Sequence, residues 1–237
     1  MQRVMDPVVF YSKIKDSLES SWASYFGIDN IRPGSTLYPA EVLKFKALLA
    51  EAKSGQSKLI LARSGAQYLY ERDRGFTKVA GVFPRALIFY QSRSLPGQDE
   101  AINTWADPNF PADQILLVEG LGEQETAGSE IMAAKAAQIL EYRNEKVAII
   151  AEAKKEGWLL LLDSYYPGWA AQVDGKAAPI LRADGFFRAV HLPAGKHKVI
   201  FSYHPPAFYR SLRISGACLV VCLLLLAVSF RKPGKRK

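Results

Sequence analysis

Three aspartates are the residues of this 237-residue chain whose type could support hydrolytic chemistry. A glycosidase-like site needs two carboxylates that flank one glycosidic bond. Asp174 precedes a glycine in a turn signal, and Asp163 follows an apolar run at a strand end, so local structure explains both better than catalysis does. Asp184 alone cannot form the pair. No nucleophile–base set is visible elsewhere, so we expect no catalytic residue and no enzymatic activity from this chain alone.

The histidines and cysteines lack the spacing of a metal site. His191, His197 and His204 fall on or near different predicted strands, without a motif such as HxxxH. Cys218 and Cys222 both lie in one apolar segment, so they offer no CxxC motif and no disulfide within the rest of the chain. A glycine-rich phosphate loop is also missing. We therefore expect neither a metal nor a cofactor.

Four aromatic residues near the middle of the second half have two interpretations. Trp158, Tyr165, Tyr166 and Trp169 could form a platform that stacks on sugar rings. In the alternative, which we favour, the tryptophans belong to the core and the tyrosines form a packed corner. The candidate glycan contacts that remain to be tested are Tyr165, Tyr166 and Trp169.

The net charge of +8 is concentrated at the C-terminus. Seven of the 31 basic residues follow residue 209 and no acidic residue does, which leaves 24 basic and 23 acidic residues in 1–209. A nucleic-acid surface needs lysines and arginines clustered on the folded domain. The nearly neutral domain therefore argues against a nucleic-acid partner.

An uncharged apolar segment separates these basic residues. Residues 214–230 would rise about 26 Å as a helix, and Leu212 can extend the span. The segment is apolar on every face, unlike a core helix, which would show a polar stripe. We therefore predict a transmembrane helix over 212–230, followed by a basic cytoplasmic tail over 231–237.

The flanks of this segment predict its orientation. Five lysines and arginines follow it, against Arg210 and Arg213 just before it, so the positive-inside rule places the tail in the cytoplasm and residues 1–209 outside. Phe208 and Tyr209 fall where an interfacial aromatic belt would lie, and both arginines can reach lipid headgroups. The lipid bilayer is thus an expected partner.

The N-terminus does not show how residues 1–209 would be translocated across the membrane. Residues 1–7 begin no apolar h-region, so we recognise no signal peptide. Either the chain is tail-anchored with its domain in the cytoplasm, or it is the C-terminal piece of a larger polytopic protein.

The positions of apolar residues predict an α+β fold. Its parts are an N-terminal mixed α/β region (1–120), a C-terminal antiparallel β-sandwich (134–209) and one C-terminal transmembrane helix. Between the first two parts, 120–133 is predicted to be a loop or partly helical and to form a domain boundary. In the first region we predict helices over 40–53 and 99–105 and strands over 58–62, 67–70, 78–82, 85–90 and 114–118.

Seven short strands with turn signals between them predict the sandwich. Leu159–Leu162 is apolar on both faces and should be central, and Asp174-Gly175 is a strong hairpin signal. The strands are expected over 138–142, 146–152, 158–163, 170–173, 178–181, 186–192 and 198–203.

The strongest motif string in the chain carries a family resemblance. It reads DSYYPGW at 163–169, VDGK at 173–176, FRAV at 187–190, PAGKHKV at 193–199 and YHPP at 203–206. This string resembles the C-terminal extracytoplasmic module of YfhO-like bacterial membrane proteins, which are polytopic and related to lipid-linked-sugar glycosyltransferases. In that family the string stands just before the last transmembrane helix. The catalytic acids proposed for the family lie in a membrane body that these residues do not include, so no catalytic residue is carried over.

The resemblance implies a membrane-anchored extracytoplasmic accessory domain of a glycosyltransferase-type protein, non-catalytic by itself. Its expected partners are other membrane-protein segments or subunits and a glycan. The alternative is a single-pass structural or scaffold subunit of a larger membrane complex.

Overall fold

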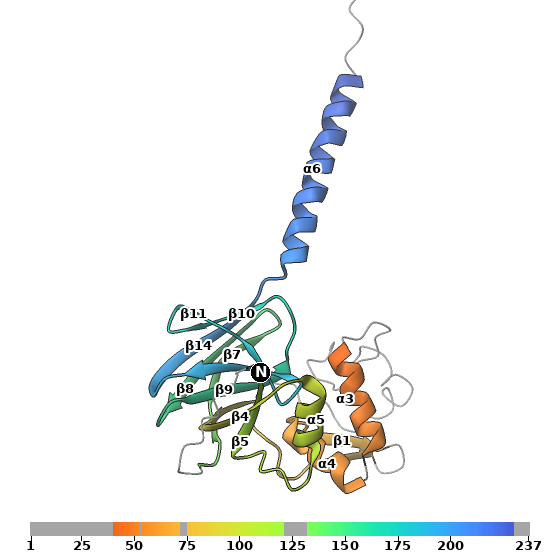
Figure 1. The fold of residues 1–237 in the computed structure, drawn as a ribbon. Helices are drawn as coiled ribbons and strands as arrows, with labels where there is room; N and C mark the ends of the chain where they lie inside the picture. The colour runs from red at the N-terminus through yellow and green to blue at the C-terminus, as the bar shows by residue number, and fades with distance from the viewer. Residues whose placement is uncertain (1–39, 53, 72–74, 121–131, 230–237) are drawn as a thin grey trace, which may run out of the picture.

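A computed structural model describes residues 40–229, except for 53, 72–74 and 121–131 (Figure 1). Two β-sheets pack face to face, and helices cover the outer face of the larger sheet. These helices are α3 (Ala40–Glu51), α4 (Ser54–Arg63) and α5 (Gln98–Ala106). The β-rich fold with few helices agrees with the predicted α+β class, and α3 and α5 confirm the two predicted helices.

The larger sheet has seven strands in the order β4-β5-β12-β13-β9-β3-β6. Only β4 and β5 pair in parallel, and α5 connects them, because parallel strands need a crossover rather than a tight turn. All other pairs are antiparallel. The strands are β3 (Ala86–Phe89), β4 (Gln91–Leu95), β5 (Ile115–Glu119), β6 (Lys135–Ala136), β9 (Gly157–Ser164), β12 (Leu181–Ala183) and β13 (Phe187–Leu192).

The smaller sheet has five antiparallel strands in the order β11-β10-β14-β8-β7. A separate hairpin, β1 (Tyr68–Glu71) with β2 (Gly75–Lys78), lies beside the helices. The five strands are β7 (Gln138–Arg143), β8 (Lys146–Ala153), β10 (Trp169–Val173), β11 (Lys176–Ala178) and β14 (Gly195–Tyr203).

Strand β9 confirms the predicted central strand, because its leucines are buried on both faces. Leu159 and Leu161 enter the core between the two sheets, whereas Leu160 and Leu162 enter the core beneath the helices. Successive side chains of a strand point to opposite faces, so a strand between two cores must be apolar throughout. Each fully buried leucine stabilises the fold by about 1.5–3 kcal/mol.

The predicted Asp174-Gly175 hairpin is also confirmed. Val173 pairs with Lys176 across the turn between β10 and β11, and the turn residues have φ angles of 50° and 80°. Both are the positive values that a type I′ turn requires.

Three predicted strands are wrong in whole or in part. The segment 58–62 lies in helix α4, since a short apolar run cannot be distinguished from a buried helical segment by pattern. The segment 78–82 contributes only Lys78, the last residue of β2. The segment 178–181 divides at Pro179, which has no N–H for a ladder, so β11 joins the smaller sheet and β12 the larger one.

The two predicted regions share one sheet. Strands β3, β4 and β5 come from 1–120, and they complete a sheet whose other strands come from 134–209. One layer of the predicted sandwich is therefore built partly from the N-terminal half. Most of the predicted boundary, 121–131, lies outside the described residues.

Helix α6 (Pro206–Ser229) follows β14 and projects away from the sheets (Figure 1). Among the described residues, the structure contains no helix that is both long enough and apolar enough to cross a membrane. The transmembrane helix over 212–230 is therefore unconfirmed and stays a prediction. The predicted tail, 231–237, lies outside the described residues.

Candidate functional site

One of the predicted glycan contacts, Trp169, lies at the end of the sandwich from which α6 leaves. Trp169 begins β10 and pairs with Tyr203 at the end of β14, three residues before α6. The backbone N–H of His204 donates to the carbonyl of Gly168 at 2.7 Å, which ties the loop before β10 to the start of α6. We call this region the α6-proximal end.

Three polar side chains join the two sheets at this end. Arg188 on β13 donates from Nη2 to Oδ2 of Asp163 on β9 at 2.7 Å. The hydroxyl of Tyr142, on β7 of the other sheet, donates to Oδ1 of the same carboxylate at 2.9 Å. Together with Trp169 they form what we call the inter-sheet clasp.

A β-bulge positions the clasp. Phe187 pairs with Ser164, but the next residue, Arg188, pairs with Leu161, so Asp163 lies in the extra length of β9. Bulges of this kind bend a strand locally and redirect its side chains. Here the bulge lets a strand with an apolar interior present a carboxylate at its end.

Arg188 is buried to an unusual degree for an arginine. Its side chain is only 2 % exposed, and its guanidinium lies 3.8 Å from the ring centroid of Trp169 and 5.4 Å from that of Phe201. Burial lowers the pKa of Arg188, and the Asp163 charge opposes that shift. Its Nε and Nη1 groups have no hydrogen-bond partner among the described residues, so the aromatic faces and Asp163 must compensate for lost hydration.

The two tyrosines beside the clasp differ in their surroundings. The guanidinium of Arg182 lies over the Tyr165 ring, 5.0 Å from the ring centroid. Arg182 also forms an ion pair with Glu119 at 3.5 Å. Burial raises the pKa of Glu119. Tyr166 is 46 % exposed. The packed-corner interpretation of the two tyrosines and the sugar contact by Tyr165, Tyr166 and Trp169 both stay predictions.

The other two aspartates lie in turns and contact partners outside the clasp. Asp174, in the β10–β11 turn, accepts from the backbone N–H of Lys198 at 2.8 Å and contacts His197 Nδ1 at 2.7 Å. This pairing lowers the pKa of Asp174 and raises that of His197. Asp184 is buried in the β12–β13 turn, where it accepts from the Leu117 N–H at 3.1 Å. Burial raises the pKa of Asp184 to about 7.

The histidines also occupy separate places. His191 contacts Glu156 at 2.9 Å, His197 contacts Asp174, and His204 lies between β14 and α6. Within the described ranges, no group of three or more metal-ligating side chains comes together.

The predicted interface residues lie on the first turns of α6. Phe208 is 60 % exposed, and Arg210 and Arg213 are exposed as well. The side chain of Tyr209 lies outside the described part of the chain.

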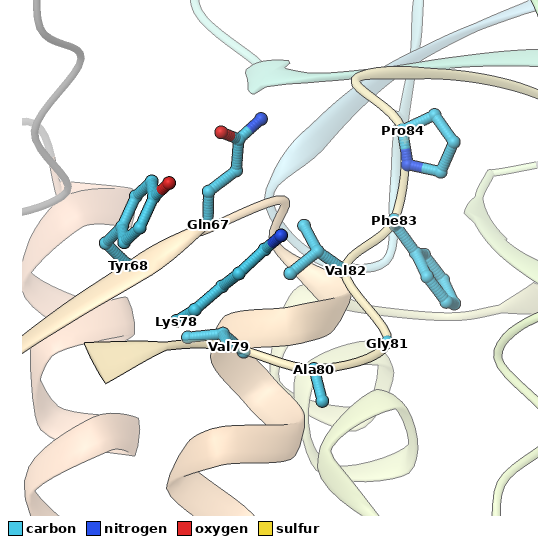
Figure 2. Close-up of a pocket in the computed structure, with 9 residues that line it drawn as sticks. All are labelled: Gln67, Tyr68, Lys78, Val79, Ala80, Gly81, Val82, Phe83 and Pro84. Atoms are coloured by element: carbon cyan, nitrogen blue, oxygen red, sulfur yellow. The ribbon is translucent and has the colours of Figure 1, made fainter.

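A hollow of about 650 Å³ lies elsewhere, on the β1–β2 hairpin and the segment that follows it (Figure 2). Gln67, Tyr68 and Lys78 line one part of it, and 79–84 line the rest. It contains none of the predicted site residues.

Tyr142 and Arg188 were not among the site residues predicted from the sequence. A single arginine within the apolar run Phe187-Arg188-Ala189-Val190 was a usable signal, since an arginine is almost never fully buried without a partner. Nothing in the sequence near Tyr142 connects it with Asp163, because that contact depends on how the two sheets pack.

Comparison with known proteins supports the family resemblance. Residues 123–215 match a family described as "Bacterial membrane protein YfhO". The resemblance is thereby confirmed over strands β6 to β14 and the start of α6. Among curated proteins, none matches the chain significantly.

Solved structures of the arabinofuranosyltransferase AftD from Mycobacteria also match. One is 26 % identical and covers 44 % of this chain, with a TM-score of 0.32. A mutant form of AftD is 27 % identical and covers 43 % of this chain, also with a TM-score of 0.32. The matched part of this chain spans 8 % of the length of each AftD chain.

Proposed function

We propose that this chain, which resembles the YfhO family over 123–215, is the extracytoplasmic accessory part of a membrane glycosyltransferase-type protein. In this proposal α6 anchors the domain, and the α6-proximal end holds a glycan close to the bilayer without catalysing its transfer. The observation that carries the proposal is the short connection of two residues between Tyr203, the partner of Trp169, and the start of α6.

Exposed apolar side chains support the anchoring role of α6. The exposed apolar side chains of α6 form one continuous surface. A large apolar patch on a protein surface marks a binding site for another protein or for a membrane. Lipid chains would cover this surface at every angle around the helix. The exposed large residues of α6 are Phe208, Leu212, Ile214, Leu219, Val220, Val221, Leu223, Leu224, Leu225 and Leu226.

The ends of this apolar surface agree with a membrane boundary. Arg210 and Arg213 are exposed on the first turns, where long side chains can reach headgroups. The uncharged stretch 214–230 runs one residue beyond the described end of α6 and is followed by the basic residues 231–237. This charge distribution supports an outside position for the sheets.

The structural contacts of the three aspartates support a non-catalytic role for this chain. Asp163 neutralises a buried arginine, Asp174 closes a turn, and Asp184 accepts a backbone hydrogen bond within the core. A retaining or inverting glycosidase instead brings two carboxyl groups to one bond. These three belong to different elements and contact different partners.

Protease accessibility tests the anchored, external arrangement. An epitope is placed after Lys237 of the protein in its native bacterium, with its natural upstream sequence and partners, and protease is added to intact spheroplasts. We expect digestion of the sheets and a protected fragment that contains α6 and the epitope. Protection of the whole chain would place the domain in the cytoplasm and contradict the proposal.

Affinity purification separates the proposal from the scaffold alternative. The accessory role predicts that the chain associates with, or is continuous with, a polytopic membrane protein of glycosyltransferase type. Stoichiometric purification with a membrane complex that contains no such protein would favour a structural subunit.

A further inference from the structure

The Asp163 carboxylate is held rigidly at the edge of the inter-sheet clasp. The buried guanidinium of Arg188 binds one oxygen, and the Tyr142 hydroxyl binds the other. The side chain of Asp163 nevertheless stays 14 % exposed. A carboxylate has about four acceptor positions, and these two hydrogen bonds use two of them. The clasp therefore presents a fixed acceptor to a molecule outside the sandwich.

The Tyr142 ring lies directly beside this acceptor. Its hydroxyl is bound to Asp163, and the guanidinium of Arg85 lies 4.4 Å from its ring centroid, so both its end and one face are restrained. The residue is still 43 % exposed. A tyrosine held in this way loses little conformational entropy when a ligand packs on it.

An exposed aromatic surface beside a fixed carboxylate matches the chemistry of a sugar. The C–H groups of a sugar ring pack on aromatic rings, and two neighbouring hydroxyls can both donate to one carboxylate. We propose that Tyr142 and Asp163 form a binding site for a neutral saccharide unit with two adjacent hydroxyls. This inference rests on the proposed function, because it names the residues that would contact the glycan.

The sign of the charge determines the ligand class. The positive charge of Arg188 is buried and committed to Asp163, and the guanidinium of Arg85 is engaged with one face of the Tyr142 ring, so the group that offers hydrogen-bonding positions to a ligand is the Asp163 acceptor. At that acceptor a hydroxyl donor is favoured over a carboxylate or phosphate. The site also differs from the contacts predicted from the sequence, since neither Tyr165 nor Trp169 supplies the exposed surface.

Saturation-transfer NMR on the full chain tests this site. The chain is kept in a detergent without a sugar headgroup, so that the detergent does not compete. The neutral probes are methyl α-D-mannopyranoside, methyl β-D-galactopyranoside and methyl β-D-ribofuranoside, and the anionic probes are glucuronate and inorganic phosphate. We expect saturation transfer to at least one neutral probe at millimolar concentration. Stronger binding of the anionic probes would overturn the assignment of ligand class.

Variants locate the contact. Y142A should abolish the signal of the neutral probe, and Y142F should weaken binding about threefold, because it keeps the ring but releases one side of Asp163. The matched control is Y68A, which removes an exposed tyrosine on the β1–β2 hairpin and should bind like the parent chain. Circular dichroism confirms that each variant is folded. Since loss of the carboxylate would leave Arg188 unpaired, the tyrosine variants, rather than D163N, decide the outcome.

The outcomes separate this site from the proposed function. Binding that survives in Y142A but is lost in Y166A would overturn the Tyr142–Asp163 site and leave glycan binding at the α6-proximal end intact. If no neutral probe binds the parent chain, both the site and the glycan-holding role fail. The anchoring role is judged independently by the protease experiment.

Discussion

Removal of the Asp163 carboxylate should strongly destabilise the fold. Asp163→Ala leaves the guanidinium of Arg188, which is 2 % exposed, without its ion-pair partner, and it also deprives the Tyr142 hydroxyl of its acceptor. Breaking a buried ion pair by truncating one side costs about 3–5 kcal/mol. Because Asp163 itself is partly exposed, water can reach the vacated position, and we expect the lower end, about 3 kcal/mol.

Two further variants divide this effect into its parts. Tyr142→Phe removes one hydrogen bond to the carboxylate from a residue that is nearly half exposed, so it should cost about 1 kcal/mol. The double variant D163L/R188M replaces the pair by apolar side chains of similar size. It should be more stable than Asp163→Ala, because no buried charge remains uncompensated. When the single variants D163L and R188M are measured as well, the two sites should show a coupling energy well above the ~0.5 kcal/mol expected for independent positions.

Urea unfolding of the full chain in detergent micelles measures these differences. Tryptophan fluorescence is a suitable signal, since Trp169 lies against Arg188 and Trp158 and Trp105 are buried in the core. The same denaturant slope in all variants would show that the midpoints report stability. A loss below 1 kcal/mol in Asp163→Ala, or a double variant less stable than Asp163→Ala, would refute the argument that the clasp compensates a buried charge.

Three other outcomes follow from the described contacts. The pKa of Asp184 is raised to about 7 in the folded state, so its protonated form is favoured there, and stability should fall as pH rises from about 4 to 7. Asp184→Asn, which keeps an acceptor for the Leu117 N–H, should be more stable than the parent at pH 8 and show a smaller loss between pH 5 and 8 in thermal unfolding. Gly157→Ala places a methyl group against the carbonyl oxygen of Phe89 in the neighbouring strand, so we expect a loss of about 1–3 kcal/mol, seen as a lower urea midpoint. Finally, the purified chain should transfer no sugar from a polyprenyl-phosphate donor, because transfer needs an acidic side chain that acts as general base and a groove for the lipid. Mass spectrometry of the products measures this. Turnover that Asp163→Asn or Asp174→Asn abolishes would move the chemistry into the sandwich.

Local signals in the sequence were sufficient for much of the secondary structure. The Asp174-Gly175 turn was predictable because few residues adopt positive φ angles, and the central place of Leu159–Leu162 followed from a strand that is apolar on both faces. The concentration of basic residues after 209 and the motif string at 163–206 were equally visible, and the YfhO match covers that string. These features depend on neighbours in the chain, so no tertiary information was needed.

The tertiary structure decided which segments share a sheet. Strands β3 and β9 pair although about 70 residues separate them, and such long-range pairing leaves no trace in the local pattern. The helical state of 54–63 was decided in the same way, since the neighbouring residues Leu61 and Ala62 enter one cluster, whereas successive residues of a strand point to opposite faces.

The candidate site was likewise decided by packing. The sequence identified Trp169 and Asp163 as residues of interest, but it assigned Asp163 to a strand end and overlooked Arg188 and Tyr142. Only the stacking of two sheets brings a β7 tyrosine to a β9 carboxylate and encloses a β13 arginine between aromatic rings. A charge can be buried there because its partner and its aromatic neighbours arrive from strands far apart in the chain, which no single segment encodes.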